Sequence, residues 1–245
     1  MTAPITRIFA IPKSQAREFG VSRQRAHVAL MRGFPQNLGP EPRKAVNLLW
    51  RLDEATGTLR VQSTIPGEHP QRDWALIDER TVVFPTGGVA ARFSLDVACE
   101  KTPSSRVPPE LRLALKKARA NAQAQRQEGM ASHAVPGTSA PKGSYRSKKI
   151  VVPAAEREDW LVARLARNGL RAVSESISIS PLRYAQLAPG RGRIPFVSTQ
   201  FSALVEDAAL VRTAILEGIA AGRTYGLGLL TSHIENTPPE VQEGL

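Results

Sequence analysis

The sequence contains very little cysteine and no long apolar run. Cys99 is the one cysteine among 245 residues, which excludes an internal disulfide and any zinc or iron–sulfur site built from several cysteines. No run of about 18 apolar residues occurs, so we expect no membrane-spanning helix. The first residues show no basic segment followed by an apolar one, so we expect no secretory signal and predict a cytoplasmic protein.

Histidine is also scarce. The four histidines are His27, His69, His133 and His233, and none has a second histidine at helical ligand spacing, so the sequence gives little support for a metal site. His27 differs from the others because it falls within a short predicted helix in a basic block. A packed or capping histidine is the more frequent role for such a residue. The alternative is proton transfer at neutral pH, where an imidazole near its ordinary pKa works best.

Acidic side chains are outnumbered by basic ones. The chain has 33 Lys and Arg against 22 Asp and Glu, a formal net charge of +11. The excess falls in three blocks, at residues 1–51, 101–149 and 160–200, which acidic segments separate. Because basic side chains gain free energy by counterion release on meeting phosphates, nucleic acid is the favoured partner. A basic, partly disordered insert without such a partner is the alternative, and no block carries the large apolar helical face that membrane binding requires.

The first hundred residues alternate strands with a helix. Short β-rich runs predict strands at residues 5–11, 46–52, 59–65 and 89–99. A helix is predicted at residues 23–32, where Ser22 can cap its start. The order strand, helix, strand, strand, strand is typical of a ferredoxin-like unit, and residues 74–80 are the candidate for its short second helix.

The second half repeats this order in outline. Strands are predicted at residues 148–152, 170–180, 194–204 and 227–231, and helices at residues 156–169 and 207–221. Between the halves lies a segment rich in Ala, Lys, Arg and Gln, and then in small polar residues. We therefore predict an α+β fold with two tandem ferredoxin-like (RRM-like) βαββαβ domains, at residues 1–100 and 148–245. A basic helical and flexible insert at residues 101–147 would join them.

Two further segments could bind a ligand. The glycines of residues 218–228 follow a helix, where they would let the backbone approach a ligand closely, although a helix C-cap followed by a turn explains them equally. Their pattern matches neither a dinucleotide fingerprint nor a phosphate-binding P-loop. Residues 181–193 are predicted as a loop or hairpin tip, and they carry Arg183, Tyr184, Arg191 and Arg193.

Together these segments resemble a known family. The helix sequence Ala-His-Val-Ala-Leu-Met-Arg-Gly-Phe-Pro at residues 26–35, followed by Leu-Leu-Trp-Arg-Leu at residues 48–52, resembles the opening of the CasE family. The ending Gly-Arg-Thr-Tyr-Gly-Leu-Gly-Leu-Leu at residues 222–230 is similar to that family's C-terminal glycine-rich segment, and residues 92–101 are loosely similar to its central strand region. CasE proteins are the repeat-RNA endoribonucleases of type I-E CRISPR systems and are subunits of Cascade.

The resemblance implies a function. A CasE protein cleaves CRISPR precursor RNA at the 3′ side of the repeat hairpin, without a metal or other cofactor. The attacking group is the RNA's own 2′-hydroxyl, which gives a 2′,3′-cyclic phosphate and a 5′-hydroxyl. The product would stay bound within Cascade beside the other protein subunits, with no membrane involved. His27 matches the family's catalytic histidine, and Gln24 stands where some members have a tyrosine, so Gln24 could orient groups but not act as an acid or base.

We expect the hairpin to be bound through its shape and phosphates in a groove between the two domains. The candidate RNA-binding residues are Arg23, Arg183, Tyr184, Arg191, Arg193, Gly222, Arg223, Tyr225, Gly226 and Gly228. Two alternatives stay open. One is a non-catalytic subunit of the same complex that binds the RNA hairpin, and the other is a generic basic RNA-binding α+β protein.

Overall fold

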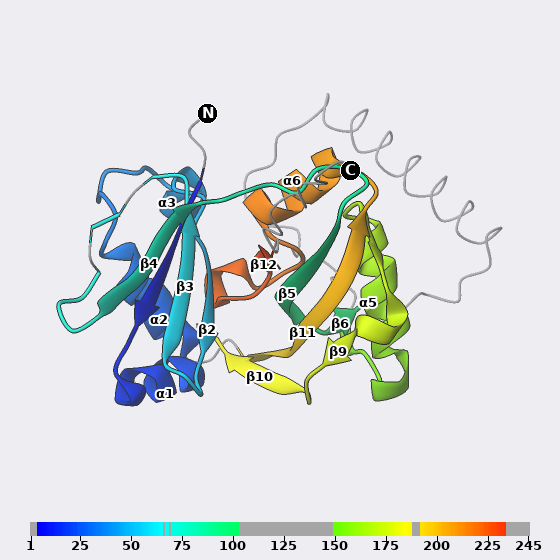
Figure 1. Ribbon diagram of the computed structural model, residues 1–245. Coiled ribbons are helices and arrows are strands. Elements are labelled where there is room, and N and C mark those ends of the chain that lie inside the picture. The colour runs from blue at the N-terminus through cyan, green and yellow to red at the C-terminus, as the bar shows by residue number, and fades with distance from the viewer. Residues whose placement is uncertain (1–3, 66, 69, 103–148, 188–191, 234–245) are drawn as a thin grey trace, which may run out of the picture. The chain divides into compact units, whose positions relative to one another are not determined.

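The computed structural model describes residues 4–65, 67–68, 70–102, 149–187 and 192–233. Nearly all of the insert predicted at residues 101–147 therefore lies outside the described residues, and so does Arg191. Residues 1–100 and 151–245 form one compact unit, whose ribbon is drawn in Figure 1. In the part of the chain that is described, no helix has both the length and the apolar character to cross a membrane.

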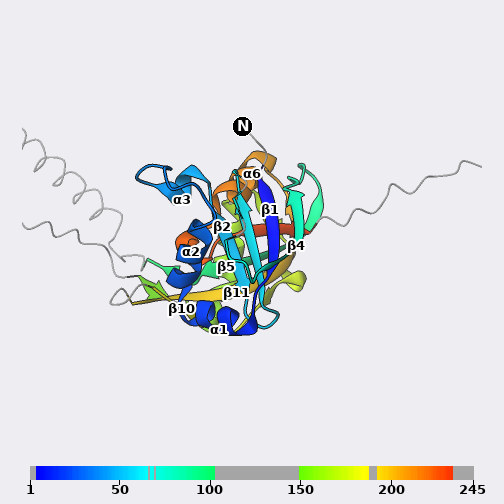
Figure 2. The ribbon, with the colours of Figure 1, turned by 90° about the vertical axis from the view of Figure 1, so that its left-hand side faces the viewer.

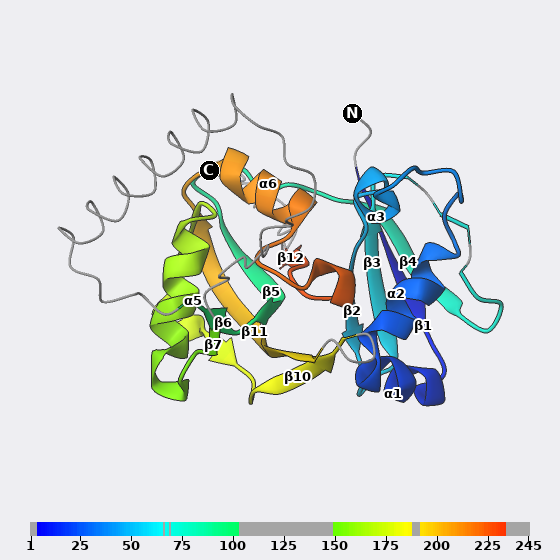
Figure 3. The same ribbon diagram turned by 180° about the vertical axis from the view of Figure 1, so that it is seen from behind.

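The first sheet has four antiparallel strands in the order β2-β3-β1-β4. These strands are β1 (Ile5–Ala10), β2 (Leu49–Asp53), β3 (Thr58–Ser63) and β4 (Ala75–Thr81). Figure 2 shows β1 between β2 and β4, which form the two edges. Helices α1 (Lys13–Val21) and α2 (Arg23–Met31) cover one face (Figure 3), where Phe9, Phe19, Leu30 and Trp50 belong to one apolar core. A short helix, α3 (Pro42–Ala45), precedes β2.

The helix predicted at residues 74–80 is wrong, because this segment forms β4. Its backbone pairs along the free edge of β1 and so satisfies hydrogen-bonding groups that would otherwise be unpaired. As a helix the segment would gain little from burial, since Leu76 is 44% and Ile77 60% exposed. The sequence also gave no sign of α1, which begins directly after Pro12 and buries Ala16 and Phe19.

The second sheet has six antiparallel strands. These are β5 (Ala90–Ala98), β8 (Leu170–Ala172), β9 (Ser178–Ile179), β10 (Arg183–Gln186), β11 (Arg193–Val205) and β12 (Leu230–His233). The order is β10-β11-β5-β12, and β8 and β9 also pair with β11. Helices α5 (Arg157–Ala166) and α6 (Ala208–Glu217) share a core with β5 and β11 that includes Phe93 and Phe201. A separate pair joins β6 (Glu100–Lys101) to β7 (Ile150–Val151).

The strand predicted at residues 89–99 was expected to complete the first sheet, and this was wrong. As β5 it lies between β11 and β12, because β4 already occupies the fourth place in the first sheet. Each half then has the ferredoxin-like strand order, with β5 as the first strand of the second half. The predicted fold class, α+β with tandem ferredoxin-like units, is confirmed, and the boundaries between the domains stay a prediction.

Two predicted segments of the second half have a different form. The strand expected at residues 170–180 is interrupted by the 3-10 helix η2 (Ser174–Ser176), because the Ser176 hydroxyl accepts a hydrogen bond from the Ser202 backbone N–H at 2.8 Å in place of a strand partner. The loop expected at residues 181–193 contains β10 and the start of β11. A further 3-10 helix, η1 (Ala154–Glu156), precedes α5.

A buried arginine joins α2 to both sheets. Arg23 is 0% exposed, and its guanidinium carbon lies 5.7 Å from the ring centroid of Trp50 on β2 and 5.4 Å from that of Phe196 on β11. Burial lowers the pKa of Arg23, and the negative charges of Asp96 and Glu54 oppose that shift. The Glu54 carboxylate lies 3.4 Å from the guanidinium. Arg23 therefore fixes the position of α2 relative to the second sheet.

The glycine-rich segment packs against β2. It contains the 3-10 helix η3 (Arg223–Tyr225), which contacts both α2 and β2. The Trp50 indole N–H donates a hydrogen bond to the Thr224 carbonyl at 3.3 Å. Gly226 has φ +72°, and a Cβ at this position would lie 2.6 Å from carbon atoms of the Trp50 ring. Only glycine therefore allows η3 to lie this close to β2.

We predict that Gly226→Ala destabilises the protein more than Gly88→Ala. Gly88 is a matched control, because its φ is +77° and a Cβ there would meet nothing within 4 Å. Both changes carry the left-handed backbone cost of about 1–2 kcal/mol, and Gly226→Ala adds overpacking of about 1–3 kcal/mol. The measurement is the free energy of unfolding by chemical denaturation without RNA. Equal losses for the two variants would contradict the packing of η3 on Trp50.

Candidate active site

His27 lies on α2, four residues after the buried Arg23, on the helix that contacts both η3 and β10. Its ring is half-buried, and Nδ1 is buried with no hydrogen-bond partner among the described residues. Burial lowers the pKa of His27, and the positive charge of Arg43 lowers it further. The imidazole is therefore neutral at neutral pH, the form that accepts a proton.

Arg43 supplies positive charge near His27, and Arg223 lies near Arg43. Arg43, on α3, donates a hydrogen bond to the Leu48 carbonyl at 3.1 Å. Burial lowers the pKa of Arg43, and the nearby charge of Arg223 acts in the same direction. The Arg223 Nε is buried without a partner in the described part of the chain. Two guanidinium groups held together in this way favour an anion between them, and a phosphate is the anion that fits their planar donors.

The same two arginines line a cavity of about 640 Å³. Lys44 and Arg212 add two more cationic side chains to its lining, and Glu217 is the single carboxylate among the described lining residues. The cavity therefore carries an excess of positive charge next to the helix that holds His27.

Gln24 does not share this environment. It lines a smaller hollow of about 290 Å³ together with residues of α1, including Gln15 and Glu18, and with Val28 of its own helix. The described residues that act on the pKa of His27 include an arginine but no acidic partner. A role for Gln24 beside His27 stays a prediction that this geometry does not favour.

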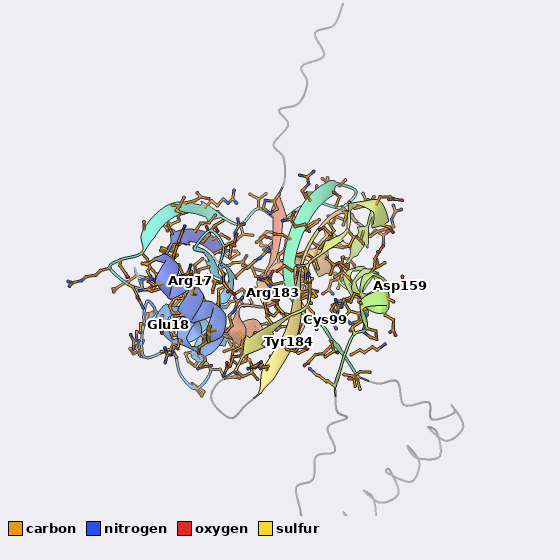
Figure 4. All side chains as sticks on the ribbon, turned by 90° about the horizontal axis from the view of Figure 1, so that it is seen from below. Arg17, Glu18, Cys99, Asp159, Arg183 and Tyr184 are labelled. Carbon is orange, nitrogen blue, oxygen red and sulfur yellow. The ribbon has the colours of Figure 1, made fainter. Side chains whose placement is uncertain are left out.

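Two of the predicted RNA-binding side chains stand on β10, where Figure 4 labels them. Tyr184 is 53% exposed, so its ring is free to stack on a base. Arg183 is exposed, and its guanidinium carbon lies 4.8 Å above the Phe196 ring while it donates to the Ser198 hydroxyl. Arg193 is exposed at the start of β11, opposite Gln186 of β10. These three side chains give the β10–β11 pair a basic, accessible surface.

Other predicted RNA-binding residues have packing roles instead. Arg23 is fully buried, so it is not available to a phosphate in solution. Gly226 and Gly228 are buried, and a Cβ on Gly228 would lie 2.5 Å from the Ile219 carbonyl oxygen. Gly226 and Gly228 hold η3 in place, and their direct contact with RNA stays a prediction that this burial does not favour. Gly222, Arg223 and Tyr225 are half-buried and remain partly accessible.

Arg43 is the residue of this site that the sequence analysis missed. It follows His27 by sixteen positions and is one of several basic residues in the block at residues 1–51. Pro42 at the first position of α3 is the one local signal, because proline is favoured there and predicts a helix start. That signal predicts the start of a helix, but it does not predict that this helix lies near His27.

Comparisons with known proteins identify the family and the fold. The profile of a family described as CRISPR associated protein matches residues 5–232. A comparison with curated protein sequences found no match. Among solved structures, the chain is similar to Thermus thermophilus Cse3 bound to an RNA representing a pre-cleavage complex, with a TM-score of 0.68, 15% identity, and coverage of 95% of this chain and 100% of that one.

A second solved structure has the same fold. Cas6e from Escherichia coli str. K-12 matches with a TM-score of 0.57 and 17% identity, over 93% of this chain and 98% of that one. At these identities the similarity establishes the fold, and it agrees with the tandem ferredoxin-like order of the two sheets. The family match covers nearly the whole described chain, including His27, both sheets and the glycine-rich segment, and the chain thus belongs to the family of CRISPR associated proteins.

Proposed function

We propose that the chain is an endoribonuclease that cleaves CRISPR precursor RNA at the 3′ side of the repeat hairpin without a metal ion. The observation that carries this proposal is the neutral, unpartnered imidazole of His27 beside the positive charge of Arg43, with Arg223 next to Arg43. An RNA-cleaving site needs a proton acceptor and cationic groups for the phosphate, and these residues supply both.

The reaction requires one base and a set of cationic groups that bind the phosphate. The His27 imidazole takes the proton of the 2′-hydroxyl, and the 2′-oxygen attacks the adjacent phosphorus. The bond from phosphorus to the 5′-oxygen breaks, and the leaving oxygen takes a proton from the imidazolium or from water. The products are a 2′,3′-cyclic phosphate and a 5′-hydroxyl. Arg43 and Arg223 stabilise the extra negative charge that builds on the phosphate oxygens in the transition state.

RNA binding is assigned to the surface next to this site. α2 contacts β10, so the exposed Tyr184 and Arg183 lie on the element next to the helix that carries His27. The structures of similar fold include Cse3 bound to a 19-nucleotide RNA, and a chain of a CRISPR RNA-guided surveillance complex with a TM-score of 0.57 and 20% identity. These relatives support an RNA substrate and the subunits of a CRISPR RNA-guided complex as partners. That the RNA is the repeat hairpin, and that it stays bound within Cascade after cleavage, is part of our proposal.

A non-catalytic hairpin-binding subunit is the second candidate, and one observation favours it. The side chain three residues before His27 is Gln24, which lines the hollow beside α1 and supplies no acid or base. Under this second hypothesis the arginines bind the RNA, and the protein does not cleave it. Incubating the protein with its repeat RNA in EDTA and mapping the product ends separates the two candidates.

We predict that His27→Ala lowers the cleavage rate by about 10²–10⁴-fold and changes hairpin affinity less than twofold, because the imidazole moves a proton but contributes little to binding. The measurement is single-turnover cleavage of the repeat RNA, with affinity measured separately on RNA that carries a 2′-deoxy cut site. Val28→Ala is the control, since Val28 is the neighbouring exposed residue of α2. Unchanged cleavage by His27→Ala would overturn the enzymatic assignment and leave a binding subunit.

We predict that Arg43→Gln moves the acidic limb of the kcat/KM pH profile to higher pH. The lowered pKa of His27 comes first from burial and second from the charge of Arg43, so removing that charge raises the pKa part of the way back. A base must be deprotonated, so activity is lost below its pKa, and a higher pKa means loss at a higher pH. The maximum rate should also fall, because the phosphate loses one guanidinium. A limb that stayed in place would show that Arg43 does not act on His27.

We predict that Tyr184→Ala weakens hairpin binding by about 1–3 kcal/mol, because an exposed aromatic ring loses its stacking on an unpaired base. Tyr184→Phe keeps the ring and should bind nearly as well as the wild type, which separates stacking from hydrogen bonding by the hydroxyl. Fluorescence anisotropy with labelled hairpin at fixed salt measures both. Equal losses for the two variants would assign Tyr184 a hydroxyl contact instead.

A further inference from the structure

Each sheet has one face that packs against its main helices and an opposite face, and α6 reaches that opposite face of the first sheet only at one end, where Gln62 donates a hydrogen bond to the Ile215 carbonyl at 2.7 Å. On β2 and β3 the residues Trp50 and Leu59 face the helices, so Arg51 and Arg60 project from the opposite face. On β5 the residue Phe93 faces α5 and α6, so Arg92 projects from the opposite face of the second sheet. A cavity of about 630 Å³ is lined from both of these opposite faces.

Basic side chains stand directly opposite one another in this cavity. Arg51 on β2 is the register partner of Arg60 on β3, and Arg92 on β5 is the register partner of His233 on β12. All four line the cavity, which we call the arginine trough. Like charges directly opposite across a ladder are destabilising, so the Arg51–Arg60 pair is unfavourable for the protein alone. Burial and the surrounding arginines lower the pKa of His233, so Arg92 is the charged member of the second pair.

The carboxylates near the trough leave part of this charge uncompensated. Asp53 lines the cavity, Asp96 pairs with Arg51 at 3.1 Å, and Asp78 lies 3.6 Å from Arg80. Within the described chain, the side chains of Arg60 and Arg92 form neither a hydrogen bond nor an ion pair. Burial lowers the pKa of Arg60, and the neighbouring charges of Arg80 and Arg51 lower it further, with Asp78 opposing. An anion with several oxygens would pair these free guanidinium groups.

The trough continues beyond the first cavity. An adjoining hollow of about 250 Å³ shares Arg60 and adds Arg80, Gln62 and Thr231 to the lining. Arg60 therefore lines both the larger cavity and the adjoining hollow, and Arg80 provides a further cation along the first sheet. A row of cations that extends past one pocket fits a chain of phosphates better than a single small anion.

The chemistry of the lining favours RNA backbone over a protein segment. Phe93 is the one aromatic besides His233 among the described lining residues of the larger cavity, and Phe93 is fully buried, so the trough offers bases no stacking surface other than the His233 imidazole. The lining consists largely of arginine, serine, threonine and glutamine side chains, so it is not an apolar groove that would bind an apolar helix. Guanidinium groups without aromatic platforms bind phosphates irrespective of sequence.

We propose that the arginine trough binds the sugar–phosphate backbone of a single-stranded RNA segment adjoining the hairpin, as a second site on the opposite face of β2 from His27. The proposal rests on the proposed function for the hairpin itself. β2 is an edge strand, with Trp50 packed against η3 on one face and Arg51 in the trough on the other.

The test compares three labelled RNAs by fluorescence anisotropy across a salt series: the bare repeat hairpin, the hairpin with a single-stranded extension, and an unstructured oligouridylate. The variant is Arg60→Gln with Arg92→Gln. The control is Arg17→Gln with Arg72→Gln, which removes the same charge from two exposed arginines outside the trough. We expect the trough variant to bind the extended hairpin and the oligouridylate at least tenfold more weakly, and the bare hairpin within twofold of the wild type.

The salt dependence and the stability provide independent readouts. Losing two phosphate contacts should reduce the slope of log K against log salt by about 1.4 for single-stranded RNA, and the control pair should leave it unchanged. The trough variant should also unfold at a temperature no lower than the wild type, because Arg60 stands opposite the cation Arg51 and the Arg92 side chain has no ion pair among the described residues. A markedly lower unfolding temperature would show that these arginines are structural and would overturn the proposal.

The outcomes also separate this proposal from the proposed function. If the wild type failed to bind the bare hairpin but the trough variant lost oligouridylate binding, the trough would stand and the hairpin assignment would fall. If both variants bound the extended hairpin and the oligouridylate equally, the trough proposal would fall alone. A polyglutamate peptide that bound the wild type but not the trough variant, when oligouridylate bound both alike, would assign the trough to an acidic protein partner and overturn it.

Discussion

The guanidinium group of Arg23 sits between the two halves of the protein, and the position of α2 depends on it. A fully buried cation is unfavourable unless its surroundings compensate the charge. Here the rings of Trp50 and Phe196 lie within cation–π distance, and Asp96 and Glu54 supply negative charge. Trp50 belongs to the first sheet and Phe196 to the second, so this one side chain couples both sheets to the helix that carries His27. Replacing it by an apolar residue would remove that coupling.

The sequence predicted the elements whose pattern is local. The helix starting at Arg23 was predicted to within one residue of its observed end, and the strands that pair as β2 and β3 were expected from short β-rich runs at residues 46–52 and 59–65. His27, Tyr184 and Arg183 were chosen from residue type and from a family resemblance, and the structure gives each a position compatible with that choice. Such features depend on a few neighbouring residues, which is why sequence reasoning reached them.

The features that the sequence did not predict depend on contacts between distant segments. β4 and β5 both contain strand-forming residues. The sheet that each strand joins depends on which sheet edge is free to pair, and no local sequence pattern predicts that. Arg23 and Arg43 were alike in the sequence, as basic residues in one block. In the folded protein Arg23 is buried between two aromatic rings, whereas the charge of Arg43 lowers the pKa of His27. Charge in a sequence therefore indicates a polyanionic partner without telling which arginines meet it.

The alternation of side chains along β2 links the two sites. Successive residues of a strand point to opposite faces, so Trp50 and Arg51 belong to different environments although they are adjacent in the chain. Trp50 supports η3, with Gly226 against its ring, and so shapes the surroundings of His27. Arg51 projects into the arginine trough and pairs with Asp96, whose carbonyl in turn accepts a hydrogen bond from the Gly228 backbone N–H at 2.6 Å. A displacement of β2 would therefore disturb both faces together, which makes this edge strand the structural connection between the hairpin site and the trough.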